Sequence, residues 1–111
     1  MPLLSVSTSI EINEKKLFLK NCSQLVSKLT NKPEQYVMVR LFDQTSMYFN
    51  MDQSPSCFID FKSIGSLNPS EMSKEISIFI SNEIGIPANR VYICFEDIEA
   101  SNWSWNGKTF G

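Results

Sequence analysis

Two stretches of the chain, KPEQYVMV at residues 32–39 and IPANRVYI at residues 86–93, follow nearly the same pattern. In each stretch a proline at the second position precedes a run rich in β-branched and aromatic residues. Such runs favour β-strands, and the proline marks the turn that leads into the strand. Because each stretch follows a segment of helical periodicity, the repeat predicts two copies of one strand–helix–strand unit.

The first unit begins at the chain start. Residues 3–10 alternate between apolar side chains and serines, which predicts a half-buried strand. From Asn13 the period becomes helical, and Pro33 follows the predicted end of this helix. Residues 36–42 form the next predicted strand. The buried face of the helix is predicted to contain Phe18, Cys22, Leu25 and Leu29.

The second unit follows a turn at residues 43–46, a short predicted strand at 47–50 and a polar loop that reaches Pro55. Residues 57–64 and 91–95 are its predicted strands. For the helix between them, Asn68 is the expected N-cap, Pro69 the first helical residue and Glu71 the partner in a capping box. Gly85 is expected to end this helix. Its buried stripe is predicted to contain Met72, Ile76, Phe79, Ile80 and Ile84.

These elements predict an α+β fold, an α/β sandwich in a single domain of residues 1–111. Strand–helix–strand crossovers are right-handed, so two βαβ pseudo-repeats place both helices on one face of a shared four-stranded mixed sheet. The other sheet face stays uncovered. Apolar surface left in water costs about 25 cal/mol per Å². We therefore expect a partner subunit to cover that face.

Composition excludes several function classes. Ten basic and twelve acidic residues give a net charge of −2, and the chain contains no basic run. The sequence therefore predicts no basic surface for binding nucleic acid. No apolar stretch approaches the roughly 18 residues of a membrane span. The N-terminus lacks the basic and apolar regions of a secretory signal, so a cytoplasmic location is expected.

The cysteine and histidine counts restrict the chemistry further. Cys22, Cys57 and Cys94 are odd in number and irregularly spaced, which indicates reduced thiols rather than a disulfide framework. The chain contains no histidine. That removes most zinc sites and the usual general base, so catalysis would need carboxylates, lysine, tyrosine, cysteine or the chain terminus.

Five short motifs are spread over essentially the whole chain: Met1-Pro2, Lys32-Pro33 with Gln35-Tyr36, Ser63-Ile64-Gly65, Arg90-Val91-Tyr92-Ile93 and the tail Trp105-Asn106-Gly107-Lys108-Thr109-Phe110. Together, in matching order, they resemble the macrophage migration inhibitory factor family. The resemblance implies a homotrimer with active sites between subunits. It also implies cofactor-independent keto–enol tautomerase activity on phenylpyruvate-like acids and dopachrome-like compounds.

In this family the N-terminal proline is the catalytic base. A small second residue allows an aminopeptidase to remove Met1, which turns the Pro2 nitrogen into a free secondary amine. An ordinary α-amine titrates near ~7.7–8.0, and an apolar pocket disfavours its charged form. Such an amine can act as a general base near neutral pH in place of histidine. An isolated Met-Pro would instead be read as a proline tolerated at a strand entrance.

The resemblance also assigns substrate-binding residues. Lys32 matches a lysine that holds the substrate carboxylate, and Ile64 matches a position whose backbone N–H contacts substrate. Tyr92 matches a tyrosine supplied by the adjacent subunit, and Tyr36 matches an aromatic residue at the rim. In the tail, Trp105 and Phe110 correspond to walls of an apolar pocket. Each of these side chains has a plainer alternative as a solvated lysine, a strand-end residue or a packing anchor. Asn106-Gly107 is also a strong hairpin turn signal.

Two positions depart from the family pattern. Cys94 stands where animal members carry a substrate-contacting asparagine, and a thiol is a weak hydrogen-bond donor. Dopachrome-type substrates are therefore expected to bind less well, and a small buried hydrophobe is the favoured interpretation of Cys94. Some members carry a Cys-x-x-Cys stretch, but Ser56 and Ile59 occupy those positions here. Thiol oxidoreductase activity through that motif is expected to be absent.

Two other functions stay open on sequence alone. One is a cytokine-like signalling or protein-interaction module with a vestigial tautomerase pocket, since family members act outside cells without a signal peptide. Secretion by such a route is then the alternative to a cytoplasmic location. The other is a monomeric α/β binding domain that merely looks similar. The leading hypothesis is a tautomerase of small aromatic 2-oxo acids.

Overall fold

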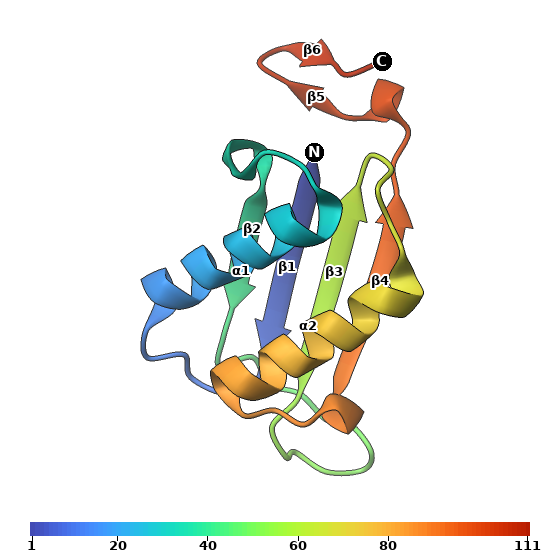
Figure 1. Cartoon of the computed structure of the whole chain (residues 1–111). Helices are drawn as coiled ribbons and strands as arrows, with labels where there is room; N and C mark the ends of the chain where they lie inside the picture. Colours follow the sequence, from blue (N-terminus) through green and yellow to red (C-terminus); the bar gives the residue numbers. More distant parts are fainter.

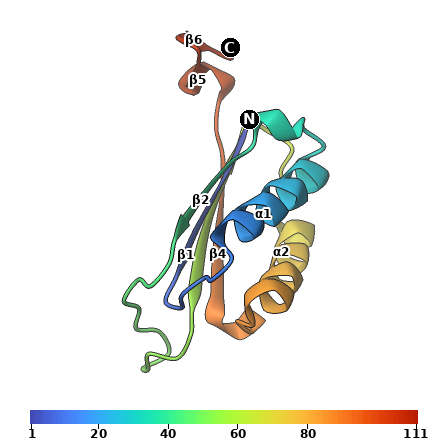
Figure 2. The same ribbon diagram turned by 90° about the vertical axis from the view of Figure 1, so that its left-hand side faces the viewer.

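The computed structural model describes residues 1–111 and contains a four-stranded mixed sheet with two helices on one face (Figures 1 and 2). The strands are β1 (Pro2–Thr8), β2 (Met38–Phe42), β3 (Cys57–Ser63) and β4 (Val91–Asp97), in the order β2-β1-β3-β4. β1 is parallel to β2 and antiparallel to β3, while β3 is parallel to β4. The predicted α/β sandwich of two βαβ pseudo-repeats is confirmed.

The first helix, α1 (Lys15–Thr30), buries Phe18, Cys22, Val26 and Thr30. Leu25 and Leu29 are half-buried and pack against the margin of the core. The predicted apolar face is therefore confirmed, with Val26 and Thr30 as further buried members.

The second helix, α2 (Pro69–Ile84), buries Met72, Ile76 and Ile80, while Phe79 and Ile84 pack at the margin of the core. Pro69 occupies the first turn as predicted. The capping-box prediction was wrong, because the Asn68 side chain makes no cap hydrogen bond. Gly85 ends the helix in the left-handed conformation, with φ of +75°.

The two units repeat each other at the entrance to their last strands. A short 3₁₀ turn follows the proline in each, η1 (Glu34–Tyr36) before β2 and η2 (Ala88–Arg90) before β4. Beyond β4 the chain forms η3 (Ala100–Asn102) and a small hairpin of β5 (Ser104–Trp105) and β6 (Lys108–Thr109). Asn106 and Gly107 lie at its turn with φ of +53° and +80°, which confirms the predicted hairpin.

The predicted strand at residues 47–50 does not form. Phe49 and Asp52 instead exchange backbone hydrogen bonds across a tight turn, with Asn50 and Met51 at positive φ. Arg90, the one charged residue that is buried, organises this loop. Its guanidinium lies 2.9 Å from an Asp52 carboxylate oxygen. It also donates to the carbonyl oxygens of Phe49, Ser54 and Pro55 and to the Ser56 hydroxyl.

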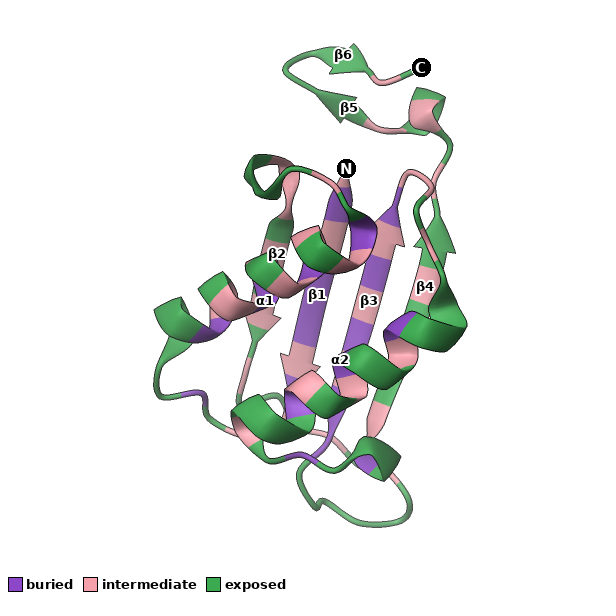
Figure 3. Cartoon of the chain, in the orientation of Figure 1, coloured by how far each residue is buried: buried purple, intermediate pink, exposed green.

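The core lies between the helices and the central strands, where the buried residues concentrate (Figure 3). Its sheet side contains Leu4 and Val6 from β1 and Ile59 and Phe61 from β3. Since alternate residues of a strand point to opposite faces, the neighbours of these residues occupy the open face. Neither helix is both long enough and apolar enough to cross a membrane.

The open sheet face is not uniformly apolar, contrary to expectation. At one end Phe42, Ser7, Phe58 and Tyr92 are in register across the four strands. The middle row contains Arg40, Ser5, Asp60 and Cys94. Cys94 is exposed, so its interpretation as a buried hydrophobe was wrong for the single chain. The physical reason is that β4 directs this side chain to the face that no helix covers.

Arg90→Ala should destabilise the fold by about 2–3 kcal/mol, because its carbonyl and hydroxyl partners lose charge-assisted hydrogen bonds. The free energy of unfolding in urea measures this change. Lys20→Ala, which removes an exposed cation on α1, is the control and should change stability by less than about 0.5 kcal/mol. Equal stability of the two variants would contradict the role given to Arg90.

Candidate active site at the start of the first strand

The start of β1 lies inside the sheet rather than at its edge. Pro2 is paired with Ser63 of β3, and its side chain is less than 2% exposed. The Ile64 N–H donates to the Met1 carbonyl oxygen at 3.3 Å. The position of the chain terminus is therefore determined by strand pairing on both sides.

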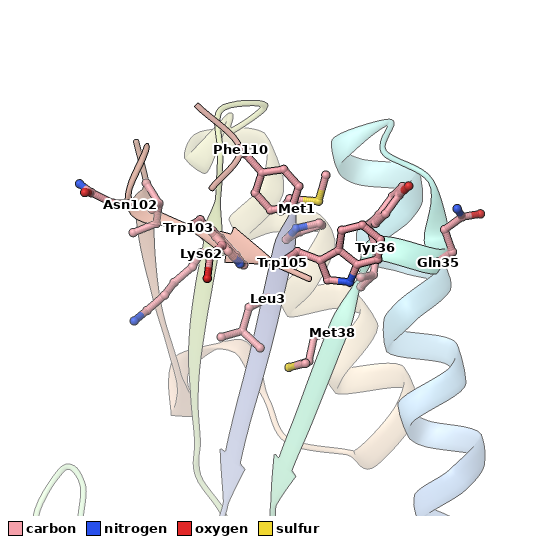
Figure 4. A pocket seen from close by; sticks show the side chains of 14 residues that line it. Met1, Leu3, Gln35, Tyr36, Met38, Lys62, Asn102, Trp103, Trp105 and Phe110 are labelled. Atoms are coloured by element: carbon pink, nitrogen blue, oxygen red, sulfur yellow. The ribbon is translucent and has the colours of Figure 1, made fainter. Parts of the chain in front are cut away.

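A cavity of about 560 Å³ opens at this chain end (Figure 4). Four segments wall it: the start of β1, the chain from η1 into β2, the end of β3 at Lys62, and the segment between β4 and the C-terminus. Tyr36 and Trp105 meet edge to face across it, with ring centroids 6.0 Å apart. The lining residues are Met1, Pro2, Leu3, Gln35, Tyr36, Val37, Met38, Lys62, Ile98, Asn102, Trp103, Ser104, Trp105 and Phe110.

The lining is largely apolar, since nine of its 14 residues are hydrophobic and none is acidic. A planar aromatic group suits such walls, because aromatic rings stack well edge to face or offset. A carboxylate in the cavity would meet no like charge from its lining. The cavity is therefore suited to an aryl compound that carries an acid group.

Lys32 lies beside the chain terminus. Its Nζ donates to the Ile64 carbonyl oxygen at 2.5 Å, and the Ser27 hydroxyl donates to the Lys32 carbonyl oxygen at 2.6 Å. Burial, together with the hydrogen bond and positive charge of Lys32, lowers the pKa of the Met1 amino group from 8.0 to about 6. The Met1 amino group is thus largely uncharged at neutral pH, which is the state that a general base requires.

The structure brings together six of the predicted site residues. Pro2, Tyr36, Trp105 and Phe110 line the cavity. Lys32 and Ile64 adjoin it through their mutual hydrogen bond and their contacts with Met1. No three histidine, cysteine, aspartate or glutamate side chains gather anywhere in the structure in a way that could hold a metal ion.

Tyr92 and Cys94 lie outside the cavity. The β4 residue in the row of Pro2 and Ser63 is Asp97. Tyr92 comes five residues earlier, which is roughly 16 Å along a strand. Its ring packs against Phe49 at 4.7 Å on the open face and is 58% exposed. Within one chain, neither side chain reaches the terminal amine.

Several lining residues were not predicted from the sequence. Met38 and Lys62 line the cavity because both are paired with Leu3, one on each side of β1. Only the strand register reveals that proximity. Lys62 Nζ lies 3.8 Å from Glu96 on the neighbouring strand. Trp103 was recognised as part of an aromatic cluster, but its place in the wall depends on the path of the chain after β4.

Comparisons with known proteins agree on one family. The family model described as macrophage migration inhibitory factor (MIF) matches residues 1–111. The macrophage migration inhibitory factor homolog of Brugia malayi is 36% identical, with complete coverage of both chains. The macrophage migration inhibitory factor of Xenopus tropicalis is 31% identical, with 99% of each chain covered.

Solved structures give the same result. The macrophage migration inhibitory factor homologue from Prochlorococcus marinus superposes with a TM-score of 0.92 at 38% identity, covering 98% of this chain and 99% of that one. The corresponding protein from Trichinella spiralis gives a TM-score of 0.91 at 30% identity, over 97% and 99% of the two chains.

Lys32→Gln should raise the pKa of the terminal amino group, because the positive charge that opposes its protonation is removed. The shift should stop below the ordinary value, since burial is the larger cause. An NMR titration of the terminal amine measures it. Lys28→Gln, an exposed position in the last turn of α1, is the matched control. An unchanged pKa of the terminal amino group in Lys32→Gln would contradict the role of Lys32 in lowering that pKa.

Proposed function

The chain belongs to the macrophage migration inhibitory factor family, and from this premise we propose that it is a keto–enol tautomerase of small aromatic 2-oxo acids such as phenylpyruvate. The proposed base is the secondary amine of Pro2 after removal of Met1, and no cofactor takes part. One observation carries the proposal: the chain start lies in a largely apolar cavity beside Lys32, where its amine has a lowered pKa.

The proposed reaction moves one proton. The uncharged Pro2 nitrogen takes a proton from the carbon beside the substrate carbonyl. The electron pair of that C–H bond forms the enol double bond, and the carbonyl π pair moves onto oxygen. This oxygen then takes a proton from water while the protonated Pro2 amine returns its own proton to water, so the base is restored and no net proton is gained or lost. The reverse sequence forms the ketone. An apolar wall keeps the amine uncharged before the reaction and strengthens the electrostatic interactions formed during it.

Lys32 and Ile64 are the proposed carboxylate and oxygen contacts. A lysine ammonium has three donors, and one of those of Lys32 is directed to the Ile64 carbonyl oxygen. The Ile64 N–H donates to the carbonyl oxygen of Met1. Removal of Met1 would release this donor at the same moment as it exposes the Pro2 nitrogen. Tyr36, Trp105 and Phe110 would then enclose the aryl group.

We further propose that the working form is a homotrimer in which Tyr92 of one subunit completes the cavity of its neighbour. The support is that Tyr92 and Cys94 lie on the open sheet face, too far from Pro2 to act within one chain. That face also exposes Met38 and Phe42. Burial of these side chains would stabilise the assembly by about 25 cal/mol per Å² of apolar surface.

A cytokine-like signalling function is the second candidate. It is favoured by the relatives that are themselves called macrophage migration inhibitory factors, in Xenopus tropicalis and Rattus norvegicus. Such a function would need the protein outside the cell, whereas the tautomerase proposal is compatible with a cytoplasmic location. A receptor interaction that persists when the cavity is blocked would favour signalling over catalysis.

Pro2→Gly should lower kcat/KM for phenylpyruvate ketonisation roughly 100-fold or more, the usual contribution of a positioned general base. Spectrophotometric assay of enol disappearance measures the rate, and intact mass verifies that Met1 is absent from both proteins. Pro87→Ala, at an exposed proline that precedes η2, is the control and should retain activity. Equal rates for Pro2→Gly and the parent would show that Pro2 is not the base.

Sedimentation equilibrium should give a particle of three times the 12.7 kDa chain mass. Tyr92→Ala should preserve that mass and raise the KM for phenylpyruvate, because the neighbour's wall loses a ring. A stable monomer with full activity would refute the shared site.

A further inference from the structure

We propose that Asp97 is a positioning residue for the carboxylate-binding corner around Lys32. It acts through the turn of residues 63–66, which joins the end of β3 to the chain before α2. The effect of Asp97 on the KM for the substrate rests on the proposed function. Asp97 itself does not line the cavity, so it is not a catalytic residue.

The contact that carries the proposal joins Asp97 to the turn. The Asp97 carboxylate oxygen Oδ1 accepts a hydrogen bond from the Gly65 N–H at 2.9 Å. Asp97 is paired with Ser63 at the ends of β4 and β3, and the Ile98 N–H donates to the Ser63 carbonyl oxygen at 2.8 Å. The end of β4 therefore holds the turn from two points.

The turn needs such support because of its backbone conformation. Gly65 and Ser66 both lie in the left-handed region, with φ of +67° and +58°. For serine this conformation is unfavourable, so surrounding contacts must maintain it. Packing gives little help, since a Cβ built on Gly65 would meet no atom within 4 Å. A hydrogen bond to a carboxylate is well suited to this purpose.

The turn of residues 63–66 also orients Lys32. The Ile64 carbonyl oxygen accepts from Lys32 Nζ at 2.5 Å, so displacement of the turn would displace the ammonium. The Ile64 N–H also loses its Met1 partner when that residue is removed. After Met1 is removed, the position of Ile64 therefore depends more strongly on the hydrogen bond between Asp97 and Gly65. We expect substrate binding to suffer more than proton transfer when the contact is lost.

Two substitutions separate the hydrogen bond from the charge. Asp97→Ala removes both, whereas Asp97→Asn keeps an amide oxygen that can accept from Gly65. Asp97→Ala should raise the KM for phenylpyruvate roughly three- to tenfold, the range of one net hydrogen bond. Its kcat should change by less than about twofold, and Asp97→Asn should lie close to the parent. Glu99→Ala, at a nearby exposed carboxylate, is the control.

Two further readouts do not depend on catalysis. Hydrogen exchange of the Gly65 amide should accelerate in Asp97→Ala but not in Glu99→Ala. Binding of 3-phenylpropionate, which carries the aryl and carboxylate groups without a 2-oxo group, should weaken by the same factor as KM rises. An inactive parent protein would overturn the proposed function, while these two measurements would still decide the role of Asp97.

Some outcomes would overturn the inference. One is that Asp97→Ala leaves the KM for phenylpyruvate and the affinity for 3-phenylpropionate unchanged. The other is that Asp97→Asn raises KM as much as Asp97→Ala does, because the charge of Asp97 rather than its hydrogen bond to Gly65 would then be responsible. Gly65→Ala strains the same turn from within, so it should reproduce the rise in KM. It serves as the test if Asp97→Ala fails to assemble, and an unchanged KM there would equally contradict the proposal.

Discussion

Pairing of β1 along both of its edges is the constraint on which the candidate site depends. The first residues of most domains are poorly ordered unless they are tied down. Here the chain starts in the middle of the sheet, between β2 and β3. This fixes Pro2 opposite Ser63 and places the terminal amine beside Lys32, Ile64 and the aromatic tail.

The second determinant is electrostatic. A chain without histidine has no side chain that ordinarily titrates near neutral pH, and in the proposed function the terminal amine takes the place of a histidine base. Burial among apolar side chains and the adjacent Lys32 ammonium both disfavour its protonation. In the proposed function the same ammonium also attracts the substrate carboxylate, so one cation would both lower the amine pKa and hold an acid substrate. The absence of acidic residues from the lining preserves both effects.

Sequence alone could predict the elements with strong local signals. Proline-marked strand entrances, the glycine that ends α2 and the Asn106-Gly107 hairpin are set by local backbone preferences, and all three are present. Features set by tertiary contacts were missed. Residues 47–50 have strand-like composition, but Arg90 instead binds the carbonyl oxygen of Phe49 and, in the following loop, that of Ser54. The exposure of Cys94 depends on which sheet face the helices cover. The positions of Met38 and Lys62 in the cavity wall depend on the strand register.

In the proposed function the Pro2 nitrogen, freed of Met1, is uncharged at neutral pH and moves the substrate proton. The most direct test is a ¹⁵N NMR titration of Pro2 in the processed protein, compared with the pH dependence of kcat/KM for phenylpyruvate. We expect kcat/KM to rise with pH through the same pKa that NMR reports, and we expect this pKa to lie well below that of an ordinary α-amine. A nitrogen that stays protonated through pH 7, or a rate profile that ignores its titration, would contradict it.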